Sequence, residues 1–161
     1  PVDVVRVGTG LITNAGPMIA PELLETFDVA YIRELIALAR SRKRIIMMHV
    51  DGVVGPLIPS LLEMGTDILN PIDPAAGTQD ITDIKDQYGD RLTLCGNIDI
   101  NGILLHGTPD EVRAEVVRKI ERLGRDGGYI VASSHDLHQD LPLENIYAMR
   151  DATHEYRFPA P

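Results

Sequence analysis

The sequence predicts an α/β fold built on a parallel sheet of the (βα)-barrel type, with five βα units where a complete barrel has eight. Five short apolar runs alternate with segments of helical periodicity. Each run ends in small or polar residues, and no two runs are joined by an Asn-Gly or Asp-Gly hairpin turn. The strands should therefore be parallel, with right-handed crossovers. A complete barrel takes about 250 residues. This chain has 161, so we expect part of a barrel, in one domain over residues 1–161.

Each expected element has a local signal in the sequence. The apolar runs predict strands at residues 2–7, 45–49, 67–71, 92–95 and 129–132. Pro21 opens a short helix, Asp80 caps another, and Thr108 with Glu111 forms a capping box. Helices are therefore expected from residue 21, and over 29–42, 56–64, 81–88, 102–106, 108–123 and 142–150. Apolar side chains that should share one face of the second helix are Ile32, Leu35, Ile36 and Leu38.

Composition narrows the class of protein. The net charge of −9 argues against nucleic acid as a partner, because binding to it relies on Lys and Arg. We find no apolar run long enough to cross a membrane and no secretion leader. Cys95 is the single cysteine, which favours a reducing, cytoplasmic setting. The chain begins at Pro1, directly before a strand-like run, which suggests either that it is processed or that it is cut from a longer protein.

The stretch from Arg44 to Gly52 is the most informative part of the chain. Four apolar residues form a strand that should be buried on both faces, and the run stops abruptly at a histidine. Side chains two apart on a strand point the same way, so His49 and Asp51 should project together from its carboxyl end. Active sites of α/β barrels are built at that end. We therefore expect the functional site around this pair.

Eight short segments, taken in order, resemble the C-terminal part of the uroporphyrinogen decarboxylase superfamily. They are residues 16–22 (GPMIAPE), 49–52 (HVDG), 62–67 (LEMGTD), 85–90 (KDQYGD), 96–99 (GNID), 107–112 (GTPDEV), 127–130 (GGYI) and 142–145 (PLEN). No segment is specific alone, but the ordered set spans nearly the whole chain. The superfamily includes the decarboxylase and zinc-dependent methyltransferases that act on corrinoid proteins. The resemblance implies that the chain is the last five units of a (βα)₈ barrel. The decarboxylase's N-terminal arginines and catalytic aspartate fall outside it.

The resemblance also implies site residues. In the methyltransferase branch a His-X-Cys at one strand end and a later Cys bind zinc. Here His49 matches the first ligand, and Asp51 and His135 stand where the two cysteines would be. These three residues would form a catalytic two-His, one-carboxylate metal site suited to Zn, Fe or Mn. The leading interpretation is metal-assisted methyl transfer to or from a small-molecule substrate, with a corrinoid carried by a partner protein.

Two alternatives stay open. His49 and Asp51 could be a hydrogen-bonded pair at a metal-free, decarboxylase-like site, with His135 binding an anionic substrate. Alternatively, the chain is a catalytically incomplete barrel that needs another chain. Five strands cannot close a barrel, so the first and last strands should be open edges. We expect association through them, as a homodimer or with an N-terminal half-barrel partner.

Four more polar residues are predicted to contact the substrate. They follow strands or begin the last helix, and they are Asn70, Asn97, Asp99 and Asn145. The competing interpretation is loop capping, since Asn and Asp often bond to nearby backbone. Cys95 lies within a strand and is expected to be a small core residue.

Overall fold

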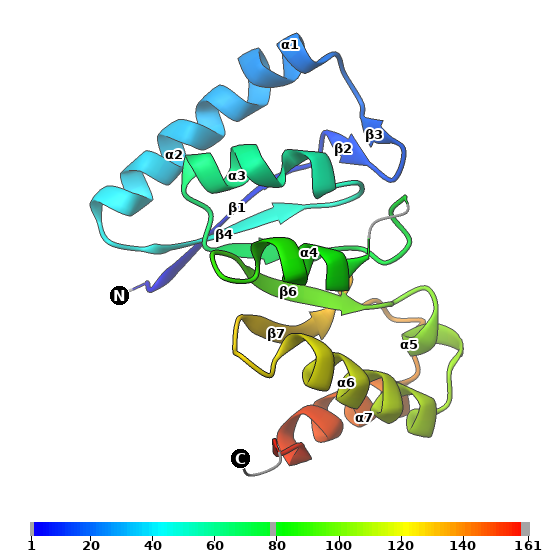
Figure 1. Ribbon diagram of the computed structural model, residues 1–161. Coiled ribbons are helices and arrows are strands. Elements are labelled where there is room, and N and C mark those ends of the chain that lie inside the picture. Colours follow the sequence, from blue (N-terminus) through cyan, green and yellow to red (C-terminus); the bar gives the residue numbers. More distant parts are fainter. Residues whose placement is uncertain (1, 78–79, 159–161) are drawn as a thin grey trace.

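The computed structural model describes residues 2–77 and 80–158 and contains a five-stranded parallel sheet (Figure 1). The sheet consists of β1 (Val4–Thr9), β4 (Ile45–Val50), β5 (Ile68–Asn70), β6 (Thr93–Ile98) and β7 (Tyr129–Ser133). The order is β1-β4-β5-β6-β7, and every neighbouring pair is parallel. The predicted α/β class, the parallel sheet and the partial barrel are therefore confirmed. The arrowheads of β4, β6 and β7 point toward the same side of the molecule in Figure 1.

Helices follow each strand along the chain. They are α1 (Pro21–Leu24), α2 (Ala30–Ser41), α3 (Ile58–Met64), α4 (Ile81–Tyr88), α5 (Ile103–His106), α6 (Pro109–Leu123) and α7 (Leu143–Glu155). A π-helical turn (Glu25–Val29) precedes α2 and a 3₁₀ turn (Gly55–Leu57) precedes α3. The predicted caps are present: the Asp80 side chain accepts from the Thr82 amide at 2.7 Å, and Thr108 and Glu111 form the capping box. None of the helices in the described residues is both long and apolar enough to cross a membrane.

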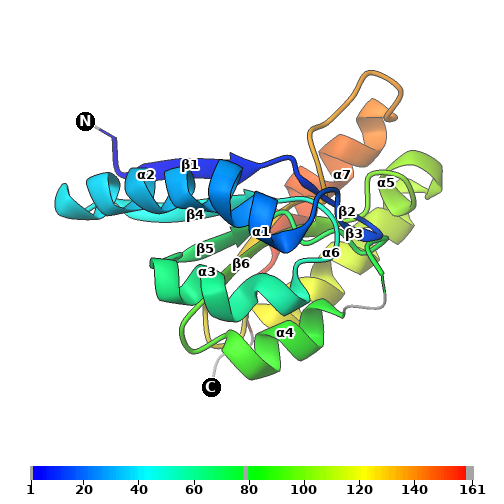
Figure 2. The ribbon, with the colours of Figure 1, turned by 90° about the horizontal axis from the view of Figure 1, so that it is seen from above.

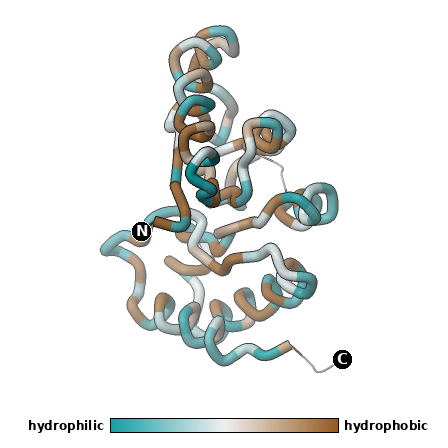
Figure 3. Tube along the Cα trace, turned by 90° about the vertical axis from the view of Figure 1, so that its left-hand side faces the viewer, coloured by the Kyte–Doolittle hydropathy of each residue, from teal (hydrophilic) through white to brown (hydrophobic). Residues whose placement is uncertain are grey.

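One face of the sheet is covered and the other is open. The strand segments are mostly hydrophobic (Figure 3), and Ile46, Leu69 and Leu94 are fully buried beneath the helices. Figure 2 shows α3 and α4 together on that side. The register places Val4 beside Ile45 on the opposite face, where they are 39% and 45% exposed. A closed barrel would bury that second face in its interior.

The buried side chains fall into two clusters. The larger one, which we call the sheet core, joins β1, β4, β5 and the start of β6 to α2, α3 and α4. The smaller one, the C-terminal core, joins the end of β6 to α5, α6 and α7, and includes Ile98, Val116 and Leu141. Packing of α6 against α7 holds this second cluster together.

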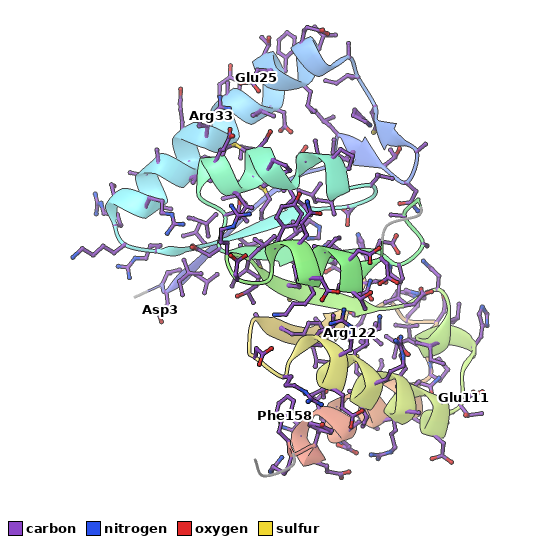
Figure 4. All side chains as sticks on the ribbon, viewed as in Figure 1. Asp3, Glu25, Arg33, Glu111, Arg122 and Phe158 are labelled. Atoms are coloured by element: carbon purple, nitrogen blue, oxygen red, sulfur yellow. The ribbon has the colours of Figure 1, made fainter. Side chains whose placement is uncertain are left out.

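The N-terminal helical region is more continuous than predicted, and its apolar face is only partly covered. The two helices expected from residue 21 to 42 form one continuous helical stretch through the π-helical turn, across which Arg33 pairs with Glu25 at 2.8 Å (Figure 4). Leu35 and Leu38 are 54% and 59% exposed, not buried with Ile36. The physical reason is position: α2 lies at the edge of the sheet, so only half of its apolar stripe faces the core.

A short antiparallel hairpin, which the sequence did not predict, follows β1. It pairs β2 (Ile12–Thr13) with β3 (Gly16–Pro17). We expected a loop there, because strands of two residues carry no detectable alternation. The backbone amide of Val53 donates to the Thr13 carbonyl at 3.1 Å, so the hairpin rests on the loop that follows β4.

Candidate functional site

His49, Asp51 and His135 come together at the carboxyl end of the sheet. One potential ligand atom from each lies within 4.8 Å of the other two. Asp51 stands between the rings: its carboxylate is 3.4 Å from Nε2 of His49 and 3.7 Å from Nε2 of His135. The His49 side chain is largely buried, Asp51 is 36% exposed and His135 is 48% exposed. The resemblance to the family implied this set of three residues, and the structure brings all three together.

Strand register explains why His49 is well placed. Gly8 of β1, His49 of β4 and Asn70 of β5 are register partners and form one row across the sheet. The Asn70 amide reaches both neighbours, because its Oδ1 lies 2.8 Å from Nδ1 of His49 and its Nδ2 donates to Cys95 Sγ at 3.4 Å. In this orientation of the Asn70 amide, Oδ1 accepts a hydrogen bond and the His49 ring donates it from Nδ1. In the neutral ring this leaves a lone pair on Nε2, the nitrogen that faces Asp51.

Gly8 leaves room for the His49 ring, and it is a site residue that sequence reasoning missed. A Cβ added at Gly8 would lie 3.1 Å from the carbonyl oxygen and 3.2 Å from the Cβ of His49. Any larger residue would push against His49. A glycine at a strand end is an available signal, but it reads equally well as a simple strand stop.

Asp51 is held by the loop that follows β4. Gly52 has φ +79°, and a Cβ there would lie 2.2 Å from the Thr13 carbonyl oxygen. Glycine thus allows the β2–β3 hairpin to lie directly against the loop. The hairpin thereby helps to fix the backbone next to Asp51.

His135 is oriented by its own loop. Its Nδ1 accepts a hydrogen bond from the Asp136 amide at 2.7 Å, and its carbonyl oxygen accepts from the Ser133 hydroxyl at 2.6 Å. A neutral His135 ring in this orientation therefore carries its proton on Nε2 and points an N–H toward Asp51. A metal could bind Nε2 only if the bond from Asp136 were given up. His49 and Asp51 fit a metal as they stand, whereas His135 fits after a local rearrangement.

Of the residues predicted to contact substrate, only Asn70 touches this triad. Asn97 is 3% exposed; its Nδ2 donates to the Ile72 carbonyl at 2.8 Å, and its Oδ1 accepts from Lys119. Positive φ angles at Gly96 and Asn97 break the strand alternation, which turns Asn97 away from the row containing Cys95. The substrate role predicted for Asn97 is untested.

Asp99 and Asn145 make local contacts. The Asp99 carboxylate accepts from the Asn101 amide at 2.9 Å, which is the loop-capping arrangement. Asn145 is 1% exposed and donates to the carbonyls of Leu104 and Gly107 at 3.0 and 2.7 Å, tying α7 to the end of α5. These hydrogen bonds stabilise the local structure around both residues. Their predicted contact with substrate is likewise untested.

Burial sets the charge state of two neighbouring groups. It raises the pKa of the Cys95 thiol, so the sulfur that receives the Asn70 bond stays neutral. Cys95 is 5% exposed, in line with the core role expected for it. Burial also lowers the pKa of Lys119, against the opposing effect of Glu115 at 3.3 Å. Cys95 therefore adds a hydrogen bond but no charge beside Asn70, whereas Lys119 pairs with Glu115 and Asn97.

The fold and the polar cluster at the strand ends define part of an α/β barrel of the kind that carries enzyme sites. The family described as uroporphyrinogen decarboxylase (URO-D) matches residues 3–156. The chain therefore belongs to the uroporphyrinogen decarboxylase family.

Individual relatives agree with this assignment. A uroporphyrinogen decarboxylase of Psychromonas ingrahamii is 28% identical over 149 residues, covering 89% of this chain and 40% of its own length. One from Methylococcus capsulatus is 35% identical over 79 residues, covering 49% of this chain and 22% of its own. A solved methyltransferase from Methanosarcina mazei matches 95% of this chain and 42% of its own, with TM-score 0.71 and 21% identity. The chain thus spans about two fifths of the first relative and of the solved structure.

Proposed function

We propose that this chain forms the metal-binding part of a barrel enzyme that carries out metal-assisted methyl transfer. The observation that carries the proposal is the arrangement of His49 and Asp51. A lone pair on Nε2 of His49 faces a carboxylate oxygen at 3.4 Å. Two acceptors at this distance repel each other unless a cation, either a proton or a metal ion, lies between them. A divalent metal supplies that cation, and His135 lies within reach as a third ligand.

The donor set indicates which metals fit. Two imidazoles and one carboxylate suit Zn, Fe(II) or Mn. A metal bound there would act as a Lewis acid and favour the deprotonated form of a substrate thiol that accepts a methyl group. His49 and Asp51 would hold the ion. Asn70 would orient His49 from behind, as partners of metal-binding histidines commonly do. The methyl donor on this proposal is a corrinoid on a partner protein.

The orientation of His135 favours a second candidate function. Its Nε2–H points into the site because Nδ1 accepts from Asp136. An N–H in this position can donate to a substrate carboxylate at a metal-free, decarboxylase-like site. The names of the curated relatives are consistent with this alternative. The two candidates therefore differ in whether His135 donates a proton or a lone pair.

The deciding experiment measures metal content and affinity in the untagged protein and in single variants. We expect about one Zn, Fe or Mn ion per chain, lost in His49→Ala and in Asp51→Ala. His135→Ala should weaken binding less, because this ring must first give up its bond to Asp136. His106→Ala is the matched control, since His106 is an exposed histidine on α5. If the protein binds none of the three metals when each is offered in excess, the methyl-transfer proposal is wrong. Tight binding of a carboxylate substrate analogue that depends on His135 would then favour the decarboxylase-like site.

We further propose that additional βα units cover the open face of the sheet. Two observations support this proposal. The chain spans only 40% of the length of the Psychromonas relative, and Val4, Ile45 and Ile130 are exposed on one face of the sheet. A groove of about 630 Å³ lies beside β1 and is lined by Val5, Leu35 and other residues of β1 and α2. An N-terminal half-barrel would fill this groove and pair with β1. A second copy of the chain, forming a homodimer, is the alternative occupant.

A further inference from the structure

We infer that Asn70 is a positioning residue whose amide orientation fixes His49 in the tautomer that presents a lone pair to Asp51. Sequence reasoning predicted that Asn70 contacts substrate. Its contacts give it a different role, because both ends of its amide are engaged by neighbours on the adjacent strands. On one side is Nδ1 of His49 at 2.8 Å, and on the other is Sγ of Cys95 at 3.4 Å.

The two ends of the amide are not interchangeable. With Oδ1 toward His49, the ring must donate from Nδ1, and Nε2 keeps its lone pair. If the amide were flipped, its NH₂ group would face Nδ1, and Nδ1 would have to accept. The ring proton would then sit on Nε2 and point at Asp51, and no metal could bind there. One side-chain amide thus determines whether the site presents a lone pair or an N–H.

Cys95 favours the orientation that leaves Nε2 open. Its sulfur accepts the Nδ2–H of Asn70, whereas in the flipped amide Oδ1 would face the sulfur. A thiol is a weaker donor than an amide N–H, and this one is 5% exposed. The inferred relay therefore runs from Cys95 through Asn70 to His49, across β6, β5 and β4. Its consequence for metal binding rests on the proposed function, but the tautomer itself does not.

The first test reads the tautomer in metal-free protein. Nitrogen-15 NMR of labelled histidine, recorded at about pH 8.5, well above the ordinary histidine pKa, distinguishes a protonated from an unprotonated ring nitrogen. We expect His49 to carry its proton on Nδ1 in the wild type and in Asn70→Asp, because a carboxylate also accepts from Nδ1. In Asn70→Leu the proton should move to Nε2. Cys95→Ala should give a mixture of the two tautomers.

Thr93→Val is the matched control, because Thr93 lies on β6 two residues before Cys95 and none of the hydrogen bonds described above that join His49, Asn70 and Cys95 involves its side chain. It should leave the Nδ1–H tautomer intact. The inference is overturned if wild-type His49 is protonated on Nε2, or if Asn70→Leu keeps the proton on Nδ1. If Asn70→Leu fails to fold, Cys95→Ala tests the inference instead. A His49 tautomer in Cys95→Ala that is unchanged from the wild type would contradict the relay from Cys95 through Asn70 to His49.

The second test measures metal affinity in the same variants. Asn70→Leu should bind the metal about 10- to 100-fold more weakly, the usual effect of losing such a partner. Asn70→Asp should stay close to the wild type. A role in stability alone would weaken both variants alike. If His49 shows the expected tautomer but the wild type binds no metal, the positioning role of Asn70 stands and the proposed function fails.

Discussion

Replacing Gly52 with alanine should destabilise the protein much more than the same change at Gly127. The two glycines have nearly the same backbone, with φ +79° and +78°. Alanine at either position pays the same strain for a left-handed conformation, about 1–2 kcal/mol. The surroundings differ: a Cβ at Gly127 meets nothing within 4 Å, whereas at Gly52 it would lie 2.2 Å from the Thr13 carbonyl oxygen and 2.3 Å from its carbon. The pair therefore separates backbone strain from contact with the hairpin.

The extra cost at Gly52 follows from what must move. The β2–β3 hairpin has to shift away from the loop after β4, which breaks the 3.1 Å bond from the Val53 amide to Thr13. A lost backbone hydrogen bond costs about 1 kcal/mol, and steric overpacking about 1–3 kcal/mol. We expect Gly52→Ala to unfold with about 2–4 kcal/mol less free energy than Gly127→Ala.

Urea denaturation of both variants beside the wild type measures this difference. The change at Gly52 should also weaken metal binding, because Asp51 is the adjacent residue, while Gly127→Ala leaves metal affinity unchanged. Equal loss of stability in the two variants would refute the reasoning. It would mean that the hairpin moves aside at no cost and does not hold the Asp51 loop.

Two further predictions concern the His49 pocket and the open sheet. Gly8→Ala should force His49 aside by a few tenths of an ångström and lower metal affinity, measured by calorimetry, about tenfold. Gly10→Ala should leave the affinity unchanged, because a Cβ added there meets nothing within 4 Å. Equal metal affinities in the two variants would show that Gly8 does not shape the site. Sedimentation velocity at micromolar concentration should show that the wild type associates. The double variant Val4→Lys, Ile130→Lys should be monomeric, whereas the control Leu143→Lys, at an exposed residue of α7, should still associate. A monomeric wild type would contradict an interface through the open face.

Most of the fold could be predicted because its signals are local. The five strands coincide with apolar runs, and α4 and α6 begin at caps that side chains of Asp80 and Thr108 provide. What could not be predicted depends on neighbours. The exposure of Leu35 and Leu38 could not be predicted, because an amphipathic pattern shows which side chains share a face and not whether a second element covers it. The next unit of a barrel would have to lie there.

The site divides in the same way. Alternation along β4 placed His49 and Asp51 together, and the resemblance to the family added His135, which stands where the second zinc-binding cysteine would be. The same alternation placed Asn97 on the face of Asp99, but Gly96 and Asn97 adopt positive φ angles that interrupt it. Asn70 lies beside His49, while its predicted contact with substrate stays a prediction. The two contacts of its amide, which indicate its role, depend on register between strands and are invisible in the chain alone.

The His49, Asp51 and His135 triad joins two parts of the chain that have separate hydrophobic cores. His49 and Asp51 follow a strand anchored in the sheet core, whereas His135 lies on the segment leading to Leu141 of the C-terminal core. An ion or substrate held by both histidines would link the part of the chain around the sheet core to the part around the C-terminal core. Without it, these two parts meet along β6 and β7. Its binding free energy would add to the work needed to pull them apart. Without a bound ion or substrate, the part of the chain around the C-terminal core would unfold before the part around the sheet core. With the site occupied, the two parts would unfold together.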